Sequence, residues 1–216
     1  ATAGIIIGVI TLTGLGLKFS SLIIAVSGDN LFLALFLTMV ASLILGMGLP
    51  TAAAYILVAT LVAPAFVSLG VDLLAAHLFV FYGAMLSSIT PPVAMAAYAA
   101  AGLAGANPFK IALCSAQFGI CAFIMPFFFV LNPALIGIGS AVTIGIFVVK
   151  AVIACVCLAF AIQGWVFSRL NVISRAGFFT GALLMMMPQL KISTIGAALL
   201  VALCLFAFLS RPKIEE

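Results

Sequence analysis

Long apolar runs between isolated charges are the feature that most constrains how this chain can fold. The 216 residues include eight Lys or Arg and four Asp or Glu, and 67% of the residues are hydrophobic. A soluble domain carries about 25% charged residues, whereas this chain carries 6%. A helix needs about 20 apolar residues to cross a bilayer, and several of these runs are long enough. The sequence therefore predicts an all-α integral membrane protein, a helical bundle with several spans.

Clusters of Gly, Pro and polar residues divide the chain into expected helical segments. These are residues 3–26, 31–47, 51–68, 74–88, 92–104, 109–131, 141–167, 176–188 and 192–210. We predict two domains. Residues 1–135 form a transport unit made of a span, a hairpin (31–68), a broken helix (74–104) and a second span (109–131). Residues 136–216 form C-terminal transmembrane helices.

The turn between segments 31–47 and 51–68 carries no charge, and both segments are short. A loop at a membrane surface usually carries polar residues, so this composition favours a re-entrant hairpin whose tip stays inside the membrane. With such a hairpin, Asp29 and Asp72 lie on one face, together with Lys191. The other face collects the remaining loop cations, which are Lys110, Arg169, Arg175, Arg211 and Lys213. This pattern obeys the positive-inside rule, although two full spans in place of the hairpin would obey it equally well. The positive residues are scattered and form no patch, which argues against nucleic-acid binding.

Two motifs predict helix breaks at membrane depth. Residues 46–51 combine two glycines with Pro50, which lacks an N–H group. In residues 87–92, Thr90 is a plausible N-cap and Pro91 suits the first helical position. Each break leaves free carbonyls at one helix end and free N–H groups at the other, and these ends attract cations and anions respectively. Secondary transporters hold sodium and substrate at such ends, whereas the alternative is a pair of proline kinks repaired by neighbouring helices.

The oxygen atoms available at the breaks fit sodium better than protons, because no Asp or Glu lies within a span. The candidate sodium-binding residues are Gly46, Gly48, Pro50, Thr51, Ser87, Ser88 and Thr90. The candidate substrate contacts are Thr51, Thr90, Pro91 and His77. His77 is the only histidine, and a hydrogen-bonded interfacial position is its alternative role.

The same motifs resemble the large membrane subunit of TRAP transporters, the tripartite ATP-independent periplasmic carriers. The resemblance lies in residues 46–55, which read GMGLPTAAAY, and in residues 69–94, which include LGVD, HLFVFY and SITPPVA. The Gly-Leu-Pro-Thr and His-x-Phe-x-x-Tyr variants are most similar to the TAXI branch, which is often built as one fused permease. The resemblance covers residues 1–135 closely and residues 141–210 less specifically. The chain begins without Met or a basic leader, so we expect the C-terminal portion of a longer protein.

The resemblance implies a sodium-coupled elevator carrier for organic anions, carboxylates among them, in the inner membrane of a bacterium. Such carriers contain two inverted repeats, each with a hairpin and a discontinuous helix, and this chain would supply one of them. It would therefore not transport alone. The implied partners are a periplasmic solute-binding protein, a small transmembrane subunit or fused N-terminal half, and the lipid bilayer. No cofactor other than the coupling Na⁺ is implied. Many relatives carry an acidic residue where Leu49 or Pro50 stands here, which shifts the expected ligation toward backbone carbonyls.

Three other functions compete with transport. A scaffold or assembly subunit would not need the hydroxyl groups at the breaks. An intramembrane serine hydrolase would use Ser87 or Ser88 with His77, but Ser87 and His77 lie ten residues apart, about 15 Å along a helix. A passive channel is a third alternative, and nothing in the sequence resembles a selectivity filter. We therefore expect a transporter and not an enzyme.

Overall fold

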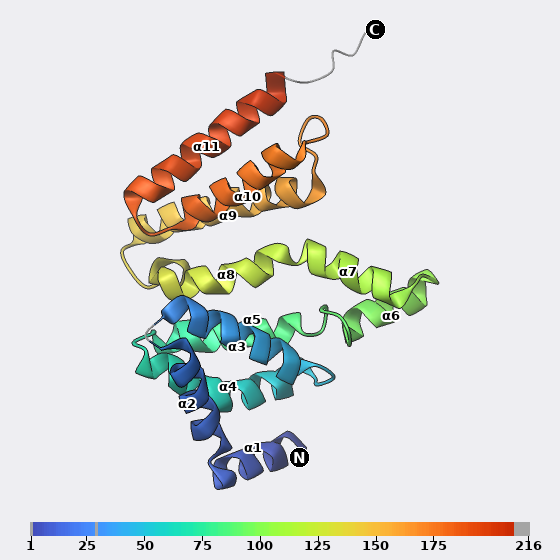
Figure 1. Cartoon of the computed structure of the whole chain (residues 1–216), viewed down its shortest axis with the longest axis vertical. Coiled ribbons are helices and arrows are strands. Elements are labelled where there is room, and N and C mark those ends of the chain that lie inside the picture. Colours follow the sequence, from blue (N-terminus) through green and yellow to red (C-terminus); the bar gives the residue numbers. More distant parts are fainter. Residues whose placement is uncertain (1, 29, 210–216) are drawn as a thin grey trace. The chain divides into compact units, whose positions relative to one another are not determined.

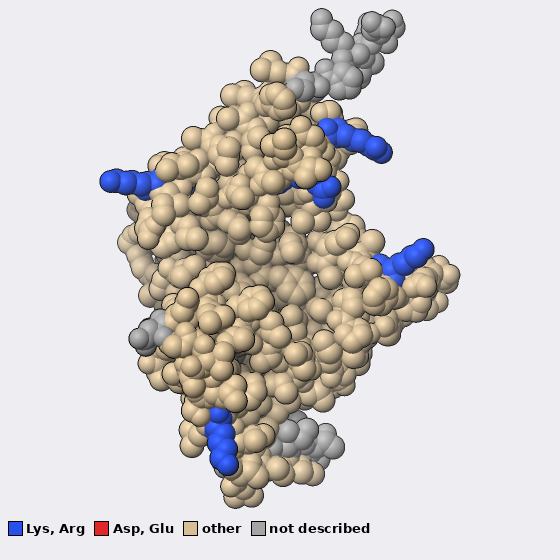
Figure 2. Space-filling view, viewed as in Figure 1, with Lys and Arg blue, Asp and Glu red and all other residues tan. Residues whose placement is uncertain are grey.

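The computed structural model describes residues 2–28 and 30–209, which form eleven α-helices and one 3-10 helix (Figure 1). The prediction of an all-α membrane bundle is confirmed. Asp29, Arg211 and Lys213, which contribute to the predicted charge pattern, lie outside the described residues. The chain separates into two compact units, Ala1–Val130 and Leu131–Glu216. On the face drawn in Figure 2, isolated Lys and Arg side chains stand apart on an otherwise uncharged surface.

The first unit contains eight helices. They are α1 (Thr2–Thr13), α2 (Leu15–Ser27), α3 (Leu31–Gly46), α4 (Thr51–Ser68), α5 (Leu73–Leu86), α6 (Met95–Ala104), α7 (Pro108–Phe118) and α8 (Ile120–Leu131). Polar side chains at three of the predicted turns cap the helices that follow. Asn30 accepts a hydrogen bond from the Leu33 N–H at 3.1 Å, Asp72 from the Leu74 N–H at 2.8 Å, and Asn107 from the Lys110 N–H at 3.2 Å. These caps satisfy N–H groups that a helix leaves without partners and so fix where α3, α5 and α7 begin.

Two segments that we expected to be single spans are each divided at a glycine. Residues 3–26 form α1 and α2, and Gly14 between them has φ of +64°, which only glycine adopts readily. Residues 109–131 form α7 and α8, which meet at Gly119 with a bend of 40°. An isolated glycine in an apolar run gives little warning of either division, because membrane helices tolerate glycine.

The core of the first unit lies between α3, α4 and α5, which run side by side (Figure 1). Its largest fully buried side chains include Leu35, Phe66 and Phe79. Edge-to-face aromatic contacts join α8 to this core, with ring centroids 5.2 Å apart for Phe79 and Phe127. Such pairs add about 0.5–1.5 kcal/mol beyond the area they bury, so this contact helps to hold α8 against α5.

Pro64 inside α4 leaves the Thr60 carbonyl without its usual N–H partner, and α2 packs against this position. A β-carbon built on Gly16 would lie 3.0 Å from the Thr60 carbonyl oxygen, so the two backbones nearly touch. One turn further along α2, the Ser20 hydroxyl donates a hydrogen bond to the Leu61 carbonyl at 2.6 Å. Small residues four apart thus allow α2 to cross α4 beside its proline.

The second unit contains a 3-10 helix, η1 (Pro133–Ile136), followed by α9 (Ala141–Gln163), α10 (Val172–Met186) and α11 (Leu190–Leu209). Glycines bring α10 and α11 close together. A β-carbon on Gly196 would collide with the Met185 backbone nitrogen, and one on Gly181 would lie 2.9 Å from Leu200 Cδ2. Arg175 of α10 closes the end of α9 by donating from Nε to the Ala161 carbonyl at 2.8 Å and from Nη2 to the Ile162 carbonyl at 2.9 Å. These contacts pack α10 against both α9 and α11.

Three helices within residues 2–28 and 30–209 are long and apolar enough to cross a membrane: α4, α9 and α11. The bent pair of α7 and α8 meets the same criterion when its two parts are joined. In contrast, α3 has 16 residues and α10 has 15, which is below the usual spanning length of about 17–25 residues.

Candidate functional site

The first break is the turn between α3 and α4. The α3 helix ends at Gly46, the Leu49 N–H donates to the Gly46 carbonyl at 3.2 Å, and Gly48 has φ of +77°. Pro50 occupies the N-cap position of α4, where no side chain accepts a hydrogen bond from the first helical N–H groups. The turn therefore presents the carbonyl end of one helix next to the N–H end of another.

The second break separates α5 from α6 by eight residues, 87–94. The prediction that Thr90 caps the second half is wrong: α6 begins at Met95, and the residue before it, Ala94, has φ of +35°. Pro91 is followed by Pro92, and a residue before proline is pushed out of the α region, so a helix cannot start at Pro91. The Thr90 hydroxyl instead donates to the Leu86 carbonyl at 2.7 Å.

The two breaks are in direct contact. A β-carbon built on Gly46 would lie 2.6 Å from Ser87 Oγ, and one built on Gly83 would lie 2.5 Å from Ser42 Cβ. Ser42 and Gly46 are four residues apart on α3, as are Gly83 and Ser87 on α5. The two helices thus run in the same direction through a pair of serine–glycine contacts, and their C-terminal ends meet. Because each C-terminal end carries partial negative charge, the junction suits a cation.

Three hydroxyl groups surround the end of α5, and each donates to a carbonyl of its own chain. Ser87 donates to Ala84, and Ser88 to Met85, both at 2.7 Å, and Thr90 bonds to Leu86 as described above. A hydroxyl has one proton and two lone pairs, so each oxygen keeps lone pairs for a cation after its proton is used. Ser87 is the most deeply placed, with 2% of its surface exposed.

The remaining candidate residues lie at different depths around this junction. Thr51, Ser88, Thr90 and Pro91 are half-buried, whereas Gly48 and Pro50 are exposed at the hairpin tip. Of the two glycines at the first break, Gly46 lies against Ser87, whereas a β-carbon on Gly48 would meet nothing within 4 Å. The sequence therefore identified both motifs, and the structure shows one contact between them, that of Gly46 with Ser87.

His77 lies apart from the junction, about 15 Å along α5 from Ser87. Its Nδ1 atom is 3.0 Å from the Tyr55 hydroxyl, and the two rings meet edge to face. This contact ties α4 to α5 and supplies a hydrogen bond of the kind expected in the alternative role of His77. It also leaves the serine hydrolase hypothesis without support, because a serine nucleophile needs a base within hydrogen-bond reach, and the Ser87 and Ser88 hydroxyls bond to helix carbonyls.

Sequence reasoning missed a third contributor, the bend between α7 and α8. A β-carbon on Gly119 would lie 2.8 Å from Cδ1 of Ile89, which belongs to the α5–α6 break. The bend therefore packs directly on the break. The only signal in the sequence was a single glycine at position 119. Its contact with Ile89, from which α6 and α7 separate it, could not be predicted from spacing. Within the described part of the chain, no group of three or more His, Cys, Asp or Glu side chains could hold a metal ion.

Comparison with models of known protein families identifies the family of this chain. The model for the DctM component of the tripartite ATP-independent periplasmic transporters matches residues 1–144, two thirds of the chain. No curated protein and no solved structure matches the chain. The matched residues include both helix breaks and the whole bundle that surrounds them. The chain thus belongs to the DctM family, the large permease component of TRAP transporters.

Proposed function

We propose that the junction of Gly46 and Ser87 is the sodium site of a sodium-coupled permease that imports organic anions, carboxylates in particular. The observation that carries this proposal is the contact between the ends of α3 and α5, since a β-carbon on Gly46 would reach Ser87 Oγ. Two helix C-termini that meet in an apolar bundle concentrate carbonyl oxygens and partial negative charge without a carboxylate. Sodium neutralises this charge, and its ligands come from Gly46, Gly48, Pro50, Thr51, Ser87, Ser88 and Thr90.

The substrate carboxylate binds next to the cation in this proposal. The N-terminus of α4 begins at Thr51 and has no side-chain cap, so its N–H groups are available to an anion. In this proposal, Thr90 and Pro91 of the second break also contact the substrate. His77 is left out of this set, because its Nδ1 atom already lies within hydrogen-bond distance of Tyr55.

The wider assembly follows from the family. TRAP permeases in general act with a solute-binding protein and a small membrane subunit. For this chain we propose a periplasmic binding protein, a fused N-terminal half in the manner of the TAXI branch, and a place in the inner membrane of a bacterium. Residues 1–135 are the moving transport unit of an elevator, with 31–68 as its re-entrant hairpin, and residues 136–216 add C-terminal transmembrane helices.

Replacing Ser87 by Ala tests the sodium site. Ser87→Ala removes one ligand oxygen and relieves the contact with Gly46, so we expect the sodium concentration for half-maximal uptake to rise about tenfold, equivalent to about 1.4 kcal/mol. The measurement is uptake of a labelled carboxylate by the complete permease in liposomes, with its binding protein, over a series of sodium gradients.

Ser68→Ala is the matched control. The Ser68 hydroxyl also donates to a carbonyl in its own helix, Ala65 at 2.7 Å, but it lies at the opposite end of α4 from the tip. The sodium dependence of uptake by the Ser68→Ala variant should equal that of the unmodified permease. Uptake that needs no sodium would refute the coupling, and an unchanged sodium dependence in Ser87→Ala would remove this residue from the site.

A further inference from the structure

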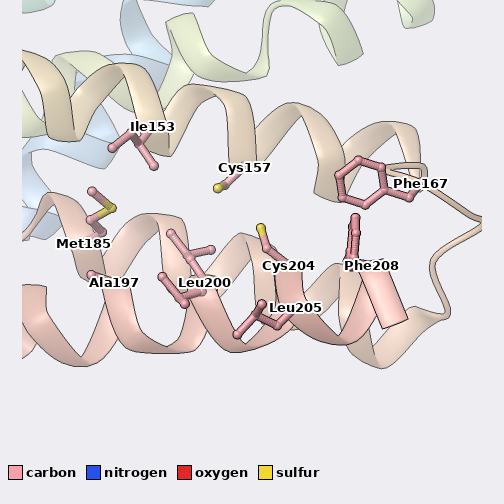
Figure 3. A pocket seen from close by; sticks show the side chains of 10 residues that line it. Ile153, Cys157, Phe167, Met185, Ala197, Leu200, Cys204, Leu205 and Phe208 are labelled. Carbon is pink, nitrogen blue, oxygen red and sulfur yellow. The ribbon is translucent and has the colours of Figure 1, made fainter. Parts of the chain in front are cut away.

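An apolar groove runs along the second unit between α9 and α11. Its volume is about 440 Å³, and its lining includes Ile153 and Cys157 of α9 and Leu200 and Cys204 of α11. Figure 3 shows the two cysteines pointing toward one another across the groove, with Met185 at one end and Phe167 beside Phe208 at the other. The rings of Phe167 and Phe208 are 5.8 Å apart and perpendicular, and they mark that end of the groove.

The length of the groove suits a single hydrocarbon chain. From Ala197 to Phe208 it follows eleven residues of α11, about 16 Å of helix, and one leaflet of the hydrocarbon core is about 15 Å thick. An acyl chain that enters the groove at the end marked by Phe208 would therefore reach its far end near the middle of the bilayer.

Cationic and interfacial side chains gather at the end marked by Phe167. Phe167 lies in the loop that joins α9 to α10, together with Trp165, which is 56% exposed, and Arg169, which is also exposed. Arg175 lies at the same end, but it donates hydrogen bonds to the last carbonyls of α9. Tryptophan and arginine are typical of the membrane–water interface, and basic groups beside membrane helices attract anionic lipid head groups.

We propose that this groove holds one acyl chain of an anionic phospholipid, whose head group lies against Arg169. The apolar lining accounts for the chain, the length of the groove places its mouth at the interface, and the positive charge at that mouth accounts for the head group. The lipid fills the space between α9 and α11 and completes the packing of the second unit.

Photolabelling in nanodiscs tests the proposal on the complete permease. The probes are phosphatidylglycerol and phosphatidylcholine that carry the same photoactivatable acyl chain, and the labelled residues are mapped by mass spectrometry. We expect phosphatidylglycerol to label residues 200–205 about fivefold more than phosphatidylcholine, which is the contribution of one basic residue near the surface. Arg169→Gln should abolish this excess, whereas Lys191→Gln, at the other end of α11, should preserve it.

A second pair of variants tests the groove itself. Ala197→Phe places a ring in the groove and should remove the label from residues 200–205, whereas Ala198→Phe adds the same ring to an exposed position that does not line the groove. Equal labelling by both lipids, labelling that spreads evenly over the exposed faces of α9 and α11, or an Arg169→Gln variant with an unchanged excess would each overturn the proposal.

Discussion

The contact between Gly46 and Ser87 depends on the lack of a β-carbon at position 46. A methyl group at position 46 would stand 2.6 Å from Ser87 Oγ and 3.0 Å from Ser87 Cβ, both shorter than a van der Waals contact. Ala84 and Leu86 at the end of α5 are themselves fully buried, so this end has little room to move away. Because Gly46 has no side chain, the ends of α3 and α5 can come into contact.

Gly46→Ala is expected to destabilise the permease by about 1–3 kcal/mol, because it forces α3 and α5 apart. Reversible unfolding of the purified protein in detergent would measure the change. Gly102→Ala on α6 is the control, since its new methyl group would meet nothing within 4 Å and alanine favours a helix. Adding Ser87→Gly to Gly46→Ala should recover much of the loss. If the two substitutions were additive, the proposed contact between the breaks would be wrong.

The helical elements show which parts of the structure sequence can predict. Turns marked by Asn30, Asp72 and Asn107 were located correctly, because a capping side chain acts within three residues of its own position. The start of α6 was located incorrectly. Thr90 and Pro91 form a standard helix-start pattern, but Pro92 pushes the residue before it out of the α region and prevents a helix from starting there. The bend at Gly119 and the approach of Gly83 to Ser42 depend on residues far apart in the chain. No local pattern specifies such contacts, so they had to come from the structure.

Gly196→Ala tests how α10 and α11 are held together. The new methyl group would collide with the Met185 backbone nitrogen and lie 2.9 Å from the Gly181 carbonyl oxygen. Backbone atoms cannot rotate away as a side chain can, so we expect a loss of about 3 kcal/mol or more in unfolding free energy. Gly145→Ala on α9 meets nothing within 4 Å and should leave stability nearly unchanged. Equal stability of the two variants would contradict the close packing of these helices.

At the scale of the whole molecule, the chain joins a unit that carries two touching helix breaks to a unit of three closely packed helices. Composition alone identified the membrane as the solvent, since so few charges are present. The motifs then identified the family, which the match to residues 1–144 confirms.

Arg175 combines a positive charge near the end of a helix with two hydrogen bonds to a neighbouring helix. From the positive-inside rule we expect its charge to contribute to the orientation of the chain during insertion, whereas its planar guanidinium donates hydrogen bonds to two carbonyls of α9 at once. Lysine would keep the charge but lacks the fork that reaches both acceptors. Arg175→Lys should therefore leave the sidedness unchanged in a reporter-fusion assay and lower the unfolding free energy by about 1 kcal/mol. A reversed orientation would refute this separation. We therefore expect the charge of Arg175 to act during membrane insertion and its hydrogen bonds to act in the folded protein.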